Sequence, residues 1–199
     1  TRNKVMKYYP KNISELSAFV AAIRPSFQSM INVFLNRESF SYNISAFDKL
    51  LQTEELPQSF ILYQEQMMGV LGYAGFPMTE TYQLIKAIAK KKTGIVEPIK
   101  EKFIEQFSNK AKCDMETTLK IWKIIEDSVG YGFNASHSLS VALDSLYGAY
   151  LKAYYPLEFY ATMLEIYTEK KNNSKLALIR QEMKEYGIKE GNMCYGMDN

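Results

Sequence analysis

Apolar residues recur along most of this chain at the three- and four-residue spacing of an amphipathic α-helix, and alternating, strand-like runs are nearly absent. One example is the stripe of Leu119, Trp122, Ile125 and Val129, which follows Asp114, a residue that can cap a helix. The pattern predicts about ten helices and no confident strand. We therefore expect an all-α fold, a single compact multi-helix domain.

Capping residues and turns set the expected limits of these helices. Ser14, Ser59 and Thr79 can each cap a helix, and Pro156 suits the first turn of another. The expected helices cover residues 15–23, 26–35, 46–51, 60–71, 79–91, 97–109, 115–129, 136–155, 156–169 and 173–187.

The chain contains no internal repeat, no low-complexity tract and no linker rich in proline, glycine and serine. The helical domain is expected to cover residues 1–188, with an irregular C-terminal tail at 189–199. Aromatic residues make up 14% of the chain, which is high. Trp122 and the aromatic side chains from Tyr147 to Tyr160 are predicted to lie in the core.

Composition limits the classes of function. A chain of 199 residues can bury a core, and 47% hydrophobic and 23% charged residues are ordinary for a globular protein. The net charge of +2 is too small to indicate a nucleic-acid partner, so that case must rest on local clustering. Cys113, Cys194 and His137 cannot form a zinc site, and no apolar run approaches the ~20 residues of a membrane span. A cytoplasmic chain without membrane contact is expected.

Positive charge is concentrated in one segment. From Lys86 to Lys112 there are eight lysines and three glutamates, a local net charge of +5. Lys86 and Lys90 are four residues apart and share a helix face, where like charges repel and where an anionic phosphate would relieve the repulsion. The alternative is a solvated face whose basic end suits the helix dipole. The lysines considered as phosphate ligands are Lys86, Lys90, Lys91 and Lys92.

The sequence offers no residue set for unaided catalysis. Metal-assisted phosphoryl transfer needs carboxylates that hold two cations about 4 Å apart. The five aspartates are not close to one another in sequence, and no predicted strand presents them. A phosphate-binding G-x-x-x-x-G-K-[ST] loop is also missing. We expect a chain that binds or positions a substrate and holds no metal itself.

The segment from Gly130 to Pro156, GYGFNASHSLSVALDSLYGAYLKAYYP, joins a glycine turn to a helix that carries the only histidine. It resembles the G-Y-G-F-N-x-S-H segment of the bacterial DNA polymerase III α subunit, a C-family polymerase, in its DnaE-type form. Five further segments between residues 14 and 188 resemble this family in the same order. They are AIRP at 22–25 (x-x-R-P-G-P), FLNR at 34–37 (F-I-x-R-K), ILYQEQMM at 61–68 (I-x-Y-Q-E-Q-x-M), IKAIAKKK at 85–92 (R-R-A-M-G-K-K-K) and YLKAYYPLEF at 150–159 (Y-L-K-A-H-Y-P-x-E-F).

The resemblance implies a fingers domain, an all-α unit that closes over the incoming dNTP and helps to hold primer–template DNA. It also implies that a palm outside this chain supplies three catalytic aspartates, and that the Mg²⁺ of the parent enzyme is not bound here. The other partners implied are the remaining domains of the parent polymerase. The implied nucleotide- and DNA-binding residues are Lys86, Lys90, Lys91, Lys92, Arg24, His137, Tyr63 and Gln64.

Each of these residues also has a structural interpretation. Arg24 precedes a proline and can fix a helix junction, and His137 can hold the glycine turn at a helix start. Tyr63 can belong to the core, and Gln64 can face solvent.

Three departures from the family motifs leave alternatives open. The family's arginine pair is Ile85-Lys86 here, its R-P-G-P is 24–27 with Ser26 and Phe27, and its lysine before Ser136 is Ala135. The alternative function is a helical protein-interaction module or a degenerate polymerase fragment that binds no nucleotide. A helix-turn-helix repressor is disfavoured because no short helix pair precedes a basic recognition helix. The first residues lack an initiator methionine, which suggests a piece of a longer protein.

Overall fold

The computed structural model describes residues 1–90, 94–129 and 133–191. These residues form eleven α-helices, ten of which have seven or more residues, one short 3-10 helix, and no strand. The all-α prediction is confirmed. The chain groups into two compact units, Thr1–Leu143 and Asp144–Asn199. The predicted limit between a helical domain and a tail at residue 188 stays a prediction.

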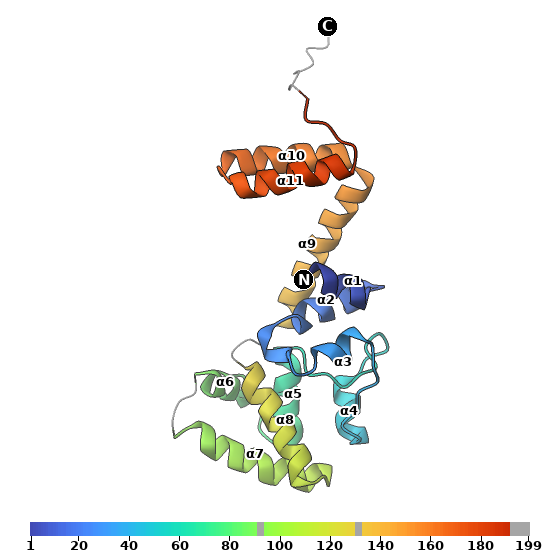
Figure 1. Cartoon of the computed structure of the whole chain (residues 1–199). Helices are drawn as coiled ribbons and strands as arrows, with labels where there is room; N and C mark the ends of the chain where they lie inside the picture. The colour runs from blue at the N-terminus through green and yellow to red at the C-terminus, as the bar shows by residue number, and fades with distance from the viewer. Residues whose placement is uncertain (91–93, 130–132, 192–199) are drawn as a thin grey trace. The chain divides into compact units, whose positions relative to one another are not determined.

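Unit one contains helices α1 to α8 and the first part of α9, and unit two contains the rest of α9 with α10 and α11 (Figure 1). The bounds are α1 Arg2–Tyr8, α2 Ile13–Ala22, η1 Pro25–Phe27, α3 Ile31–Leu35, α4 Ser45–Leu51, α5 Gln64–Ala74, α6 Met78–Ala89, α7 Val96–Ala111, α8 Met115–Ser128, α9 Ala135–Tyr154, α10 Pro156–Glu169 and α11 Asn173–Glu185.

Helix starts show which of the predicted caps were right. Asp114 caps α8 as predicted, accepting a hydrogen bond of 2.7 Å from the Thr117 N–H. The Ser14 cap was wrong, because Asn12 lies two residues earlier and accepts from the Glu15 N–H at 2.8 Å. The Thr79 cap was also wrong, since α6 begins at Met78 directly after Pro77. Pro156 occupies the first turn of α10 as predicted.

The largest boundary error concerns the predicted helix 60–71. Helix α5 begins at Gln64, and the preceding residues are buried and not helical. The Ser59 hydroxyl caps nothing, because it donates to the buried Asp48 carboxylate. The Gln66 side chain instead accepts from the N–H groups of Leu62 and Tyr63, at 2.8 and 3.0 Å. A glutamine in the first turn therefore fixes the extended approach to α5.

Two other helix predictions also differ from the structure. The segment 26–35 is not one helix, because it divides into η1 and α3. Helix α1 was not predicted at all. Residue 91, the expected end of the helix at 79–91, lies outside the described residues.

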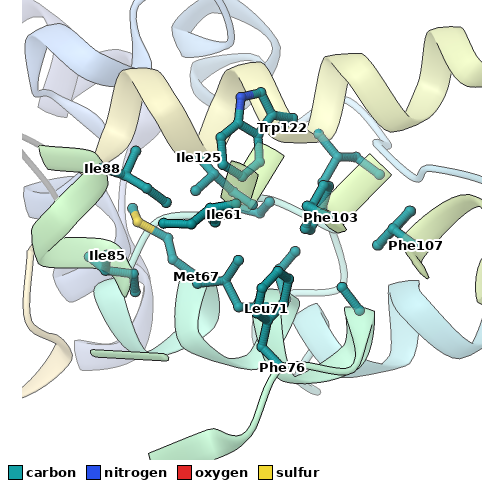
Figure 2. Packing of buried hydrophobic residues seen from close by; sticks show 14 of the residues in the cluster. Ile61, Met67, Leu71, Phe76, Ile85, Ile88, Phe103, Phe107, Trp122 and Ile125 are labelled. Carbon is teal, nitrogen blue, oxygen red and sulfur yellow. The ribbon is translucent and has the colours of Figure 1, made fainter. Parts of the chain in front are cut away.

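The larger core of unit one is formed by α4 to α8 (Figure 2). Trp122 and Ile125 enter it from α8, Phe103 and Phe107 from α7, and Met67 from α5, each at most 1% exposed. The Trp122 and Phe103 rings lie 5.3 Å apart. Trp122 is thus a core residue as predicted, and Ile85 and Ile88 of α6 belong to the same core.

A second core in unit one joins α1, α2, η1 and α3 to the segment before α5. It is mostly aromatic: the rings of Tyr8 and Phe34 stack at 4.4 Å, and those of Phe27 and Phe60 meet edge to face at 5.5 Å. Phe133, the residue before the start of α9, belongs to the same cluster. This core therefore joins the two ends of unit one.

In unit two, α10 packs against α11. Tyr160, Ile179 and Met183 are its buried core. Tyr160 is only 1% exposed, in agreement with the prediction that it is a core aromatic.

The same prediction was wrong for the tyrosines of α9 and for Tyr155, which directly precedes α10. Tyr147, Tyr150, Tyr154 and Tyr155 are 49–70% exposed. The physical reason is that α10 and α11 bury their apolar residues against each other, and no described residue of unit two covers these four rings.

Candidate functional site

Three segments that are distant in sequence meet at the ring of Phe133, within unit one. The Arg24 guanidinium carbon lies 3.1 Å from the ring centroid of Phe133. The His137 imidazole stacks on the same ring, with centroids 5.0 Å apart and an interplanar angle of 11°. Phe133 itself is 7% exposed, whereas His137 is exposed. The buried ring thus holds an arginine and a histidine at its faces or rim.

The backbone joins this cluster to the start of α5. Tyr63 and Phe133 form an isolated parallel bridge, in which the Gln64 N–H donates to the Phe133 carbonyl at 2.8 Å. At the next residue of α5, the Glu65 carboxylate accepts from the Ala135 N–H at 3.0 Å. A carboxylate is favourable there, because the first N–H groups of a helix have no partner within the helix. The starts of α5 and α9 are therefore held together.

Hydrogen bonds of Ser17 and Ser138 connect α9, α2 and Tyr63. The Ser138 hydroxyl, on α9, donates to the Ser17 carbonyl on α2 at 2.8 Å. The Ser17 and Tyr63 hydroxyl oxygens lie 3.3 Å apart. Burial raises the pKa of the Tyr63 hydroxyl above its ordinary value. Tyr63 is half-buried, so it packs within the unit while part of its ring stays accessible.

Residues at the first turn of α9 keep His137 in place. The Asn134 side-chain oxygen accepts from the Ser136 N–H at 3.0 Å and from the Ser136 hydroxyl. This is the hydrogen bonding of an N-cap asparagine. Burial lowers the pKa of the Arg24 guanidinium, which remains charged at neutral pH. The site therefore holds a cation and an imidazole against the same aromatic ring.

The predicted lysines lie elsewhere on unit one. Tyr82, Lys86 and Lys90 occupy successive turns on the exposed side of α6, and the Lys86 ammonium nitrogen lies 4.3 Å from the Tyr82 ring centroid. Within the described part of the chain, the structure pairs neither lysine with a carboxylate. Lys91 and Lys92 lie outside the described residues, as does the glycine turn at 130–132.

Three further lysines of the basic segment lie on α7, where each contacts a carboxylate or an aromatic ring. The Lys100 ammonium lies 3.5 Å from Glu97, and those of Lys102 and Lys110 lie over the rings of Phe76 and Tyr73. The run of lysines in the sequence is thus divided between two helices, and among its described members only Lys100 is paired with a carboxylate.

The structure brings together four of the predicted residues, Arg24, Tyr63, Gln64 and His137, around one ring. Among the described residues, none of these four contacts Lys86 or Lys90. Sequence reasoning missed Phe133 and Glu65 as site residues, although both stand inside the quoted motifs. Both residues can be read in the motifs, but a motif does not show which distant side chain each residue contacts in the folded chain.

A test of this cluster uses His137, the only histidine. Phe133→Leu should move the imidazole proton resonances downfield in the NMR spectrum, because the shielding face of the ring is lost, while the free energy of unfolding falls by about 1 kcal/mol. Phe40→Leu, which removes another stacked ring of unit one, should leave the resonances in place. Equal shifts in both variants would contradict the stacking.

In the described residues there is no group of three or more His, Cys, Asp or Glu side chains that could hold a metal ion. None of the described helices is long and apolar enough to cross a bilayer.

Comparison with known proteins gives a consistent result. Residues 1–111 match the family described as the bacterial DNA polymerase III alpha subunit finger domain. The chain is 33% identical over 171 residues to a DNA polymerase III subunit alpha of Mycoplasma genitalium, a match that covers 85% of this chain and 20% of that protein. It is 33% identical over 184 residues to the Campylobacter jejuni subunit, covering 90% of this chain and 15% of the relative. The Aquifex aeolicus subunit is 33% identical over 178 residues, covering 87% and 15%. The chain therefore spans a fifth or less of the length of these relatives.

Proposed function

The chain belongs to the family of bacterial DNA polymerase III alpha subunit finger domains, and from that premise we propose that it holds the incoming dNTP and primer–template DNA during template-directed DNA synthesis. A palm elsewhere in a DnaE-like polymerase supplies the catalytic aspartates. The family implies Mg²⁺ for the parent enzyme, and the described residues do not offer a site for it.

The observation that carries this proposal is the exposed side of α6. Lys86 and Lys90 are one turn apart, both are exposed, and the described carboxylates pair with neither. Two like charges in this arrangement repel each other, and a phosphate backbone or a triphosphate relieves that repulsion. The buried side of the same helix, Ile85 and Ile88, is fixed in the core, so the charges are presented by a rigid element.

Each lysine acts as a point charge on phosphate oxygens. It cannot grip a phosphate with two parallel hydrogen bonds, as an arginine can. The phosphate contact is therefore weaker than that of the family's arginine pair. Developing negative charge on a leaving pyrophosphate is stabilised by such cations.

The Phe133 cluster supports the same proposal at a second place. Arg24 is a planar cation and His137 an exposed ring, and both can contact a phosphate or the edge of a base. Gln64, half-buried at the first position of α5, is held to Phe133 through its backbone N–H and carries a side-chain amide. We assign these residues to the template or nucleotide side.

A salt titration tests the proposal. Anisotropy of a labelled primer–template should give an association constant that falls steeply between about 50 mM and about 200 mM salt. The variant Lys86→Gln/Lys90→Gln should reduce the slope of log K against log salt by about two, because each phosphate contact contributes about one.

The control is Lys49→Gln/Lys184→Gln, which removes the same charge from exposed lysines on α4 and α11. It should leave the slope nearly unchanged. A flat salt response of the unmodified chain, or an equal loss in both variants, would overturn the proposal and favour the protein-interaction alternative. Primer extension by this chain alone would contradict the assignment of catalysis to a separate palm.

A further inference from the structure

Helix α9 exposes an unusual amount of apolar surface. It is 20 residues long but buries only Ser138 and Ala142. Within unit two, five of its large apolar or aromatic residues are 46–70% exposed. We call them the α9 face: Leu146, Tyr147, Tyr150, Leu151 and Tyr154.

These five residues lie on one side of the helix. They follow the spacing i, i+1, i+4, i+5 and i+8, which places them in two adjacent rows. Single exposed apolar residues are normal, but a contiguous group of this size marks a surface that another protein surface covers. The rings of Tyr150 and Tyr154 lie 4.6 Å apart, so the face is continuous.

The remainder of unit two does not need this face. The buried core between α10 and α11 consists of Tyr160, Ile179 and Met183. Helix α9 contributes an ion pair between Lys152 and Glu182 instead. The α9 face is therefore not an unfinished part of that core.

The chemistry of the face excludes nucleic acid as its occupant. Residues 144–155 contain one acid, Asp144, and one cation, Lys152, and the cation is paired with Glu182. A surface that binds single-stranded nucleic acid combines stacking rings with a positively charged groove. Tyrosines with an apolar ring and a polar hydroxyl are instead enriched at the centres of protein interfaces.

The width of the face distinguishes between two protein occupants. Leu139, Leu143, Leu146 and Tyr150 alone have the alternating spacing of a two-stranded coiled-coil seam, which would suit a second copy of this chain. Tyr147 and Tyr154 flank that seam where coiled coils place charged residues. A stripe widened in this way is typical of a helix that packs on a globular body.

We propose that the α9 face is the surface against which another domain of the same polymerase polypeptide packs. This inference rests on the proposed function. The matched relatives are much longer than this chain, which spans only 15–20% of the three compared here, so such a polypeptide contains most of its mass elsewhere. The occupant is an apolar protein surface with hydrogen-bonding groups for the tyrosine hydroxyls.

Side-chain labelling tests the inference. Hydroxyl-radical footprinting with mass spectrometry is applied to the isolated chain and to the full polypeptide encoded by the same gene. Labelling of Tyr147, Tyr150 and Tyr154 should fall about tenfold in the full polypeptide, as expected for rings that enter a dry interface core. Tyr186, which is 57% exposed on the end of α11, is the internal control and should be labelled equally in both.

A pair of variants separates docking from a general change. Tyr150→Glu/Leu151→Glu should restore fast labelling of Tyr147 and Tyr154 in the full polypeptide, while the isolated variant stays folded because neither residue belongs to a buried core. Leu178→Glu, at a leucine 60% exposed on α11, should leave the protection intact.

Three results would overturn the inference. The first is equal labelling of the tyrosines in both proteins. The second is protection in the isolated chain that rises with its concentration, which would indicate a second copy as the occupant. The third is a gene that encodes no further domain. Failure here is distinguishable from failure of the DNA proposal, because the salt slope of the α6 lysines is measured on the isolated chain and does not involve α9.

Discussion

Replacing Arg37 by alanine is expected to lower the free energy of unfolding by about 3 kcal/mol, because it leaves the Glu15 carboxylate buried without its counterion. The value is at the low end for a broken buried pair, since the Arg37 side chain is 34% exposed while that of Glu15 is 8% exposed. Urea denaturation followed by circular dichroism measures the change.

The geometry of this pair is that of a structural anchor. Two guanidinium nitrogens of Arg37 donate to the two Glu15 oxygens at 2.8 and 2.6 Å. The same side chain also donates to the carbonyls of Tyr8 and Tyr9, both at 3.1 Å, which closes the end of α1. One arginine thus joins α1, α2 and the end of α3.

The control is Arg180→Ala, which breaks an equally short two-pronged pair with Glu190 that is about half exposed. It should cost much less than Arg37→Ala, because water screens the charges. Arg37 also has a φ of 55°, so Arg37→Gly should be less destabilising than Arg37→Ala by about 1 kcal/mol. Equal losses at positions 37 and 180 would contradict the anchoring role.

Acid should remove the difference between Arg37→Ala and the unmodified chain. Hydrogen bonding from Arg37 lowers the pKa of Glu15 below its ordinary value of 4.5, although burial acts against it. The stabilisation is therefore complete above pH 4.5 and is lost as the pH falls through the lowered pKa, where the folded carboxylate takes up its proton. Unfolding curves collected across this range measure the loss.

Replacing Asp48 by alanine is expected to cost about 3 kcal/mol, because two backbone N–H groups and two hydroxyls lose their shared acceptor. The buried carboxylate accepts from the N–H groups of Tyr42 and Ile44 at 2.9 and 3.0 Å, and from the hydroxyls of Ser41 and Ser59. The Asp48 carboxylate thus fixes the conformation of the loop that leads into α4. Thermal and urea unfolding measure the effect.

Asp114→Ala is the matched control, since Asp114 is an exposed aspartate that accepts one backbone hydrogen bond. It should cost clearly less than Asp48→Ala, because it removes only an exposed helix cap. Burial alone would raise the pKa of Asp48, but its hydrogen bonds outweigh burial and lower it below 3.8. Its contribution is present above that pH and is lost below it. If Asp48→Ala is no worse than Asp114→Ala, the loop does not depend on this carboxylate.

Helix type and approximate position could be predicted from the sequence, because the spacing of apolar residues is a local property. Asp114 and Pro156 act within three residues of their own position, and both were assigned correctly. Ser59 was not, because its hydroxyl bonds to an aspartate eleven residues away. Long-range hydrogen bonds decide between a cap and a loop anchor, and a single sequence does not contain them.

The candidate site divides in the same way. The motifs indicated Arg24, Tyr63, Gln64 and His137, but as separate segments. Only the tertiary structure places them around Phe133, since a ring contact across a hundred residues depends on how the helices pack.

The sequence by itself determined an all-α chain, its family motifs and the lysines of α6, because these follow from residue type and helical period. The tertiary structure alone decided that Asp48 and Glu15 are buried anchors and that the tyrosines of α9 are exposed. Periodicity shows that a helix has an apolar side, but only the neighbouring elements determine whether that side is covered.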